Sequence, residues 1–124
     1  MKIPLTITHI FLVVFMLLVG AQSLRAQDIT GKWYRREGGN VVDVMIVEKV
    51  GRGYHVTFKE NEQSAPYSEA HGYFRDGTLW MALMSMSPSQ SSYFGVYQLT
   101  SNGTFTGKSL RKDGTVSWEG TFVR

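Results

Sequence analysis

Three residues in the middle of the chain carry side chains suited to acid–base or metal chemistry, namely His55, Glu69 and His71. Glu69 and His71 are two positions apart, so a strand would place both on one face. A carboxylate and an imidazole on one face can hold a metal ion or exchange a proton. His55 falls on a different segment, and neither histidine has a second histidine near it in the sequence. Because antiparallel sheets routinely expose one polar face, we interpret Glu69 and His71 as solvated strand residues.

Other kinds of chemistry find no support in the sequence. It contains no Gly-x-Ser-x-Gly, His-Glu-x-x-His, phosphate-loop or dinucleotide-binding motif. The chain has no cysteine, which excludes disulfides, thiol catalysis, Fe–S clusters and cysteine-type zinc sites. We therefore predict no catalytic residue, no metal and no cofactor, and the chain is not expected to be an enzyme.

The first 26 residues have the layout of a secretory signal peptide. Lys2 supplies a positive start, Ile10 to Val19 is an unbroken apolar run, and small residues follow up to Ala26. A membrane-spanning helix needs about 20 apolar residues, so we expect no stable membrane span. We predict cleavage near Gln27, with Ala21 or Ser23 as alternative sites. The product is expected to be exported, periplasmic or secreted, and soluble.

The remainder, residues 27–124, is predicted to form one domain. Lys2 and Arg25 lie in the leader, which leaves 11 Lys and Arg against 10 Asp and Glu. These charges are scattered and mixed in sign, whereas a nucleic-acid surface needs clustered positive charge. We therefore expect no nucleic-acid partner.

Turn signals divide this domain into eight segments rich in β-branched and aromatic residues. The turns are expected at Gly38-Gly39, Gly51–Gly53, Asn61–Pro66, Asp76-Gly77, Ser87–Ser91, Ser101–Gly103 and Asp113-Gly114. The predicted strands are Gly31–Glu37, Val41–Val50, Tyr54–Glu60, Tyr67–Arg75, Thr78–Met86, Ser92–Thr100, Thr104–Arg111 and Thr115–Arg124. In the last of them Val116, Trp118 and Phe122 are expected to share one face, with Ser117 on the other.

Eight short strands joined by tight turns favour closure, because a closed barrel has no unpaired edges. We predict an all-β fold, an eight-stranded antiparallel up-and-down β-barrel. A barrel of eight strands is either filled by side chains or holds one small ligand. A two-sheet sandwich is the alternative, although its crossovers usually need longer connections.

The opening of the domain, Asp28-Ile29-Thr30-Gly31-Lys32-Trp33-Tyr34, resembles the start of the calycin superfamily of lipocalins, fatty-acid-binding proteins and avidins. The sequence of this opening motif is most similar to that of avidin-type proteins. The resemblance implies that Trp33 closes one end of the barrel and that an arginine near the end of the last strand stacks on it. Arg124 is the first candidate and Arg111 the second.

The same resemblance argues against biotin as the ligand. Avidins contact biotin from the positions that follow the tryptophan, and these are Arg35, Glu37 and Gly39 in this chain. Two charged side chains stand where the avidin pattern has an amide and an aliphatic group. The resemblance therefore implies the barrel and leaves the ligand open.

Aromatic residues are the main indication of binding. Tyr and Trp combine an apolar body with a polar handle and often line ligand sites. We predict a ligand site at the open barrel end, and the alternative is that the same rings fill the interior. The predicted ligand-binding residues are Arg35, Glu37, Tyr54, Tyr73, Tyr97 and Trp118.

Two of the segments, Val41–Val50 and Thr78–Met86, carry large apolar residues on both strand faces, so the sequence leaves open which face points inward. A barrel strand needs only one apolar face, and the other must be covered. We predict a homo-oligomer whose interface contains Trp80, Met84, Phe94 and Val96. Two functions follow: a carrier of a small molecule, or an interaction or inhibitor module that uses its outer apolar face and loops around a filled core.

Overall fold

The structure is a computed structural model that describes residues 28–85 and 92–124. The predicted leader, the cleavage site at Gln27, Met86 and the predicted turn Ser87–Ser91 lie outside the described residues. Within the described residues there is no helix, and hence none that is long and apolar enough to cross a membrane.

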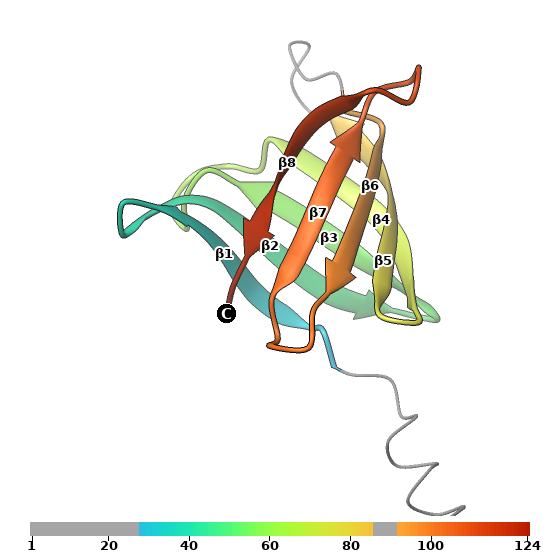
Figure 1. Cartoon of the computed structure of the whole chain (residues 1–124), viewed down its shortest axis with the longest axis horizontal. Helices are drawn as coiled ribbons and strands as arrows, with labels where there is room; N and C mark the ends of the chain where they lie inside the picture. Colours follow the sequence, from blue (N-terminus) through green and yellow to red (C-terminus); the bar gives the residue numbers. More distant parts are fainter. Residues whose placement is uncertain (1–27, 86–91) are drawn as a thin grey trace, which may run out of the picture.

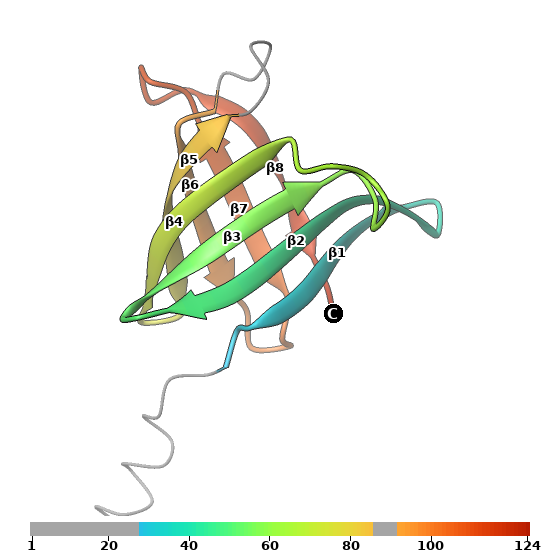
Figure 2. The ribbon, with the colours of Figure 1, turned by 180° about the vertical axis from the view of Figure 1, so that it is seen from behind.

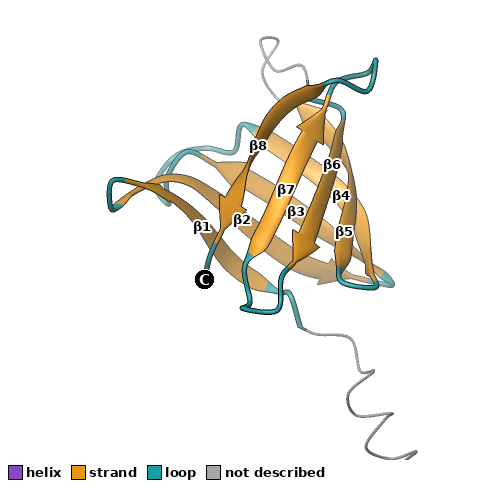
Figure 3. Ribbon diagram, viewed as in Figure 1, coloured by secondary structure: helices purple, strands orange, loops and turns teal. Residues whose placement is uncertain are grey.

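Eight antiparallel strands follow one another around the fold, each paired with its neighbour in the sequence (Figure 1, Figure 3). The strands are β1 (Gly31–Glu37), β2 (Asn40–Val50), β3 (Gly53–Lys59), β4 (Ser68–Arg75), β5 (Thr78–Ser85), β6 (Phe94–Leu99), β7 (Phe105–Leu110) and β8 (Val116–Phe122). The prediction of an all-β, up-and-down antiparallel barrel is confirmed.

The sheet curves until its two outer strands meet and nearly close the barrel. Seen from behind, β2, β3 and β4 form the near wall and β6, β7 and β8 the far wall (Figure 2). Tyr34 of β1 and Val123 beyond β8 exchange two backbone hydrogen bonds, with N···O distances of 2.6 and 2.8 Å. No other backbone bridge joins these two strands within the described residues. Up-and-down closure of this kind is consistent with a calycin-like fold.

Side chains alternate between the inside and the outside of the barrel along each strand, and those that point inward fill the interior. The structure also shows which faces of β2 and β5 point inward, a question that the sequence left open. In β5, Leu79 and Met81 are buried inside, whereas Trp80 and Met84 lie outside with about half of their surface exposed. In β2, Met45 and Val47 belong to the buried core. The core is completed by Ile29, Trp33, Tyr54, Val56, Phe58, Ala70, Tyr97, Phe105 and Phe122.

Trp33 lies in this core near the end of the barrel where β1 begins, with 1% of its surface exposed. Its indole Nε1 donates to the Ile29 carbonyl at 3.0 Å, and its ring meets Phe105 edge-on at a centroid distance of 4.5 Å. The Arg124 guanidinium lies 4.3 Å from the indole centroid and also donates to the backbone carbonyls of Asp28 and Thr30. Arg124 therefore ties the end of the chain to the first residues of the barrel across the indole face.

Two β-bulges lie at the opposite, open end of the barrel. In the first, Arg35 pairs with Asp43 and Arg36 with Val41, so Val42 is the extra residue of β2. In the second, Ser109 pairs with Trp118 and Leu110 with Val116, so Ser117 is the extra residue of β8. Each bulge re-aims the side chains beside it.

The second bulge corrects one prediction. Val116 was expected to share the face of Trp118 and Phe122, with Ser117 on the other face. Because Ser117 is inserted between Val116 and Trp118, the alternation is broken at that point. Val116 is exposed, and Ser117 lines the barrel interior.

Candidate functional site

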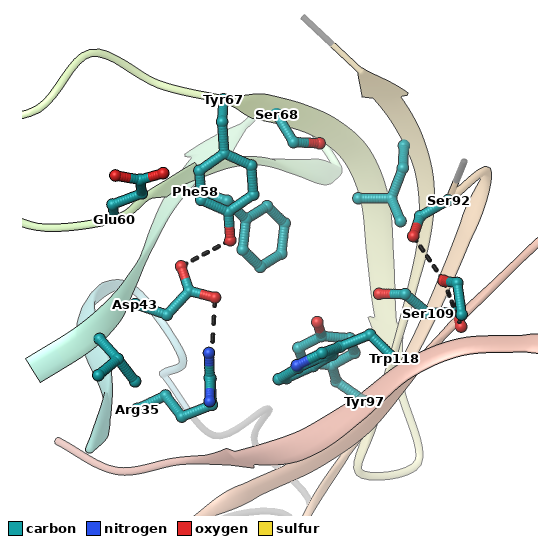
Figure 4. A pocket seen from close by; sticks show the side chains of 13 residues that line it. Arg35, Asp43, Phe58, Glu60, Tyr67, Ser68, Ser92, Tyr97, Ser109 and Trp118 are labelled. Carbon is teal, nitrogen blue, oxygen red and sulfur yellow. Dashed lines mark hydrogen bonds and ion pairs between the residues drawn. The ribbon is translucent and has the colours of Figure 1, made fainter. Parts of the chain in front are cut away.

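The open end of the barrel contains a cavity of about 550 Å³, shown in Figure 4. Pockets that hold small molecules typically span roughly 300–1,000 Å³. Its walls are formed where the strands reach the open end. The lining residues are Arg35, Val42, Asp43, Phe58, Glu60, Tyr67, Ser68, Leu83, Ser92, Tyr97, Ser109, Ser117 and Trp118. Both bulged residues are among them.

One wall of the cavity carries a cluster of buried Asp43 with the partly buried Arg35 and Tyr67. The Tyr67 hydroxyl donates to Asp43 Oδ1 at 2.6 Å. Asp43 Oδ2 lies 3.9 Å from Arg35 Nε, which makes an ion pair without a hydrogen bond. Arg35 Nε is buried and has no hydrogen-bond partner within the described residues. The register of β1 and β2 makes Arg35 and Asp43 direct cross-strand partners, which is why both point inward.

Burial raises the pKa of Asp43 to about 6, although the Tyr67 hydrogen bond and the nearby Arg35 guanidinium oppose this shift. Only 7% of the Asp43 surface is exposed, so its carboxylate has lost most of its hydration. Burial also raises the pKa of Tyr67, and the Asp43 carboxylate beside it acts in the same direction. The wall therefore contains a carboxyl that changes charge near pH 6.

A second wall, formed by the later strands, carries hydroxyl groups. Ser92 and Ser117 lie 2.6 Å apart between their Oγ atoms, and Ser117 Oγ donates to the Ser109 carbonyl at 3.0 Å. In Figure 4 Ser92 and Ser109 lie across the cavity from Arg35 and Asp43. The cavity thus has a charged side and a side of neutral hydroxyls.

Aromatic rings form much of the remaining surface, and two glycines make room for them. Gly107 and Gly120 are cross-strand partners in β7 and β8. A Cβ atom on Gly107 would lie 2.4 Å from the Tyr97 ring, and one on Gly120 would lie 2.5 Å from the Trp118 ring. Any larger residue at either position would displace an aromatic side chain of the cavity. The Arg35 guanidinium also lies over the Trp118 ring, with Cζ 5.3 Å from the ring centroid.

The predicted ligand residues fall into three places. Arg35, Tyr97 and Trp118 line the cavity. Glu37 lies at its rim, largely exposed, and accepts a hydrogen bond from Arg35 Nη1 at 2.7 Å. The other two lie away from it: Tyr54 is buried in the core, and Tyr73 is exposed on the outer face of β4.

His55 and His71 lie closer together than the sequence suggested. They are direct partners in the register of β3 and β4, and their ring centroids are 5.2 Å apart. Glu69 Oε2 lies 3.6 Å from His55 Nε2. All three side chains lie on the outer face of the sheet, and within residues 28–85 and 92–124 no group of three or more His, Cys, Asp or Glu side chains is placed to hold a metal ion.

An exposed apolar patch covers the outer face of β4, β5 and β6. We call it the outer patch; its members are Tyr73, Trp80, Met84, Phe94 and Val96. Tyr73, Trp80 and Val96 form one row through cross-strand pairing. All the residues predicted for an oligomer interface belong to this patch, on the outside of the barrel.

Sequence reasoning did not single out Asp43, Tyr67 or the serines as site residues. Asp43 is a lone carboxylate within the apolar run Val41–Val47, and that mismatch with its neighbours was the available signal. Ser117 gave no such signal, because only the bulge turns it inward.

The raised pKa of Asp43 predicts a pH dependence of stability. The unfolded chain releases this proton near pH 4, whereas the folded chain keeps it until about pH 6. Folding therefore takes up a proton between these values, and its contribution to stability is lost as the pH rises through about 6. Relative to Asp43→Asn, the original protein should lose on the order of 2–3 kcal/mol of unfolding free energy between about pH 4 and about pH 7.

Urea denaturation of both proteins across this range measures the difference. Asp76→Asn, which removes a carboxyl from an exposed turn, serves as the matched control. A difference between the original protein and Asp43→Asn that does not change with pH would contradict the prediction.

No family model, no curated protein and no solved structure matches this chain.

Proposed function

We propose that the chain is an exported small β-barrel binding protein that holds a small molecule in the cavity at the open barrel end. The observation that carries the proposal is the cavity itself, about 550 Å³ and lined by aromatic rings together with the ion pair of partly buried Arg35 and buried Asp43. A few convergent polar groups in an aromatic-walled cavity are typical of ligand sites. Export rests on the leader-like layout of the first 26 residues.

The buried charges support a binding role over a merely filled interior. A barrel that needed only stability would place apolar side chains at the positions of Arg35 and Asp43, because burying a charged group lowers stability unless it is well paired. Here Arg35 Nε has no hydrogen-bond partner within the described residues, and the pKa of Asp43 is raised by burial. Groups kept in such surroundings are typical of functional sites.

Native mass spectrometry of the protein purified from its own host tests the proposal. The expected result is a native mass that exceeds the denatured mass by one small molecule. Trp118→Ala, which removes a cavity wall, should lower the bound fraction by about tenfold or more. Trp80→Ala removes the same residue type from the outer face and should leave the bound fraction unchanged. Equal native and denatured masses, or equal losses in both variants, would overturn the proposal.

The outer patch favours a second candidate function, self-association. Four of its members, Tyr73, Trp80, Met84 and Phe94, expose about half of their surface. Large side chains bury 150–250 Å² each, so these four offer on the order of 400 Å² of apolar contact. A stable interface covers about 800 Å² per partner, and the polar surroundings of the patch would supply the rest. The same face placed against itself would give a two-fold symmetric dimer.

A further inference from the structure

The charged groups at the cavity are unequal in number. Among the lining residues that the structure describes, Asp43 and Glu60 are acidic, whereas Arg35 is the one cationic side chain. With Asp43, Glu60 and Arg35 ionised, the lining of the cavity carries one net negative charge. Such a site attracts a cationic molecule and disfavours an anionic one.

Arg35 forms an ion pair with the Asp43 carboxylate but donates no hydrogen bond to it. Its Nη1 donates to Glu37 at 2.7 Å, and its guanidinium lies against the Trp118 ring. Only its Nε approaches Asp43, at 3.9 Å and without a hydrogen bond. The Asp43 carboxylate accepts hydrogen bonds from the Tyr67 hydroxyl and from the Val44 backbone N–H. A carboxylate has about four acceptor sites, so Asp43 can still accept a hydrogen bond from a bound molecule.

We propose that the cavity selects organic amines, with the ammonium group bound at Asp43 and the apolar body of the ligand among the aromatic rings. This inference rests on the proposed function, and it names the class of molecule that the same cavity takes. A charge-assisted hydrogen bond to a buried carboxylate is stronger than a neutral one. The rings of Phe58, Tyr67 and Tyr97 supply the apolar walls, and ring faces also attract cations.

The hydroxyl wall adds a second point of recognition. Ser92 and Ser109 lie across the cavity from Asp43, and Ser117 is hydrogen-bonded to Ser92, so this wall contributes neutral donors and acceptors. An amine whose far end carries a hydroxyl or a similar polar group would meet both walls at once. The arrangement therefore fits an elongated amine with an apolar middle.

Three phenylethyl compounds of similar size and different charge test the inference by isothermal titration calorimetry on the protein from Gln27 onward and on the full chain. Phenethylamine is cationic, phenethyl alcohol is neutral and hydrocinnamate is anionic at neutral pH. Phenethylamine should bind about tenfold or more tighter than phenethyl alcohol, and hydrocinnamate should bind weakest.

Two variants locate the effect at the carboxylate. Asp43→Asn keeps the shape of the side chain and removes its charge, and it should lower the affinity for phenethylamine about 10- to 100-fold. Its affinity for phenethyl alcohol should change little. Glu119→Gln removes an exposed carboxylate from the outer face of β8 and should leave both affinities unchanged.

The affinity for phenethylamine should also fall as the pH drops below about 6, because Asp43 becomes protonated there while the amine stays charged. Arg35, Glu60, Tyr67 and Tyr97 are the other charged or titratable groups that face Asp43 across the cavity, and Asp43→Asn tests whether Asp43 is the one that controls this response. The pH dependence should be lost in Asp43→Asn.

Failure of the inference can be distinguished from failure of the proposed function. Tighter binding of the alcohol or of the carboxylate would overturn amine selectivity and leave a ligand site in place. The absence of binding by all three probes would overturn amine selectivity if the protein from its own host retains another molecule. If that protein also retains nothing, the proposed function falls as well.

Discussion

Replacement of Trp33 by alanine is expected to lower the free energy of unfolding by about 3–5 kcal/mol. The indole is almost fully buried, and its removal would open a cavity at the closed end of the barrel. The variant also loses the hydrogen bond from Nε1 to the Ile29 carbonyl and the ring face on which Arg124 lies. Urea denaturation followed by far-UV circular dichroism measures the change.

Trp80→Ala is the matched control, because Trp80 lies outside the barrel with 45% of its surface exposed. At low protein concentration it should change the unfolding free energy by less than about 1 kcal/mol. A loss in Trp33→Ala as small as that of the control would contradict the role of Trp33 in closing the barrel.

The substitutions Met81→Glu and Met84→Glu should have opposite consequences, although they lie three positions apart on one strand. Met81 points inward and is 4% exposed, packed between Gly72 of β4 and Gly95 of β6. A carboxylate there would be buried without a partner, at a free-energy cost of about 5 kcal/mol or more, comparable with the whole stability of a small domain. We expect Met81→Glu to be unfolded.

Met84 points outward and is 55% exposed, so Met84→Glu should keep the fold. If the outer patch joins two copies, this charge should also abolish the dimer that sedimentation of the original protein detects. Met81→Leu, which keeps the apolar volume, is the control and should remain folded and dimeric. Similar behaviour of the two glutamate variants would contradict the assignment of the β5 faces, and a monomeric original protein at high concentration would overturn self-association.

The architecture followed from regular features of the sequence. Gly and Asp-Gly turns at even spacing marked the hairpins, and all eight predicted strands match those of the structure to within a few residues wherever the structure describes them. Even the ambiguous strand β5 has the two faces that alternation required, Leu79 with Met81 and Trp80 with Met84. These features are local and repeat along the chain, so a single sequence suffices to read them.

The site was harder to predict because it depends on where the pattern breaks. Alternation placed Ser117 on the face opposite Trp118, and the bulge brings it into the lining of the same cavity. Asp43 becomes a cavity residue through its pairing with Arg35, and His55 meets His71 through the register of β3 and β4. Register between strands is set by the whole sheet, and it cannot be read from one strand alone.

The two bulges bear on how the length of this protein can change. A deletion within a regular strand would turn every following side chain to the opposite face and so destroy the core. A deletion of Val42 or of Ser117 would instead restore regular pairing around it, because each is already the surplus residue of its strand. Within residues 28–85 and 92–124, Val42 and Ser117 are therefore strand positions at which we expect the barrel to survive the loss of a residue. Such a deletion would change the shape of the cavity at the open barrel end. A shorter homologue would therefore keep the fold and prefer a different ligand.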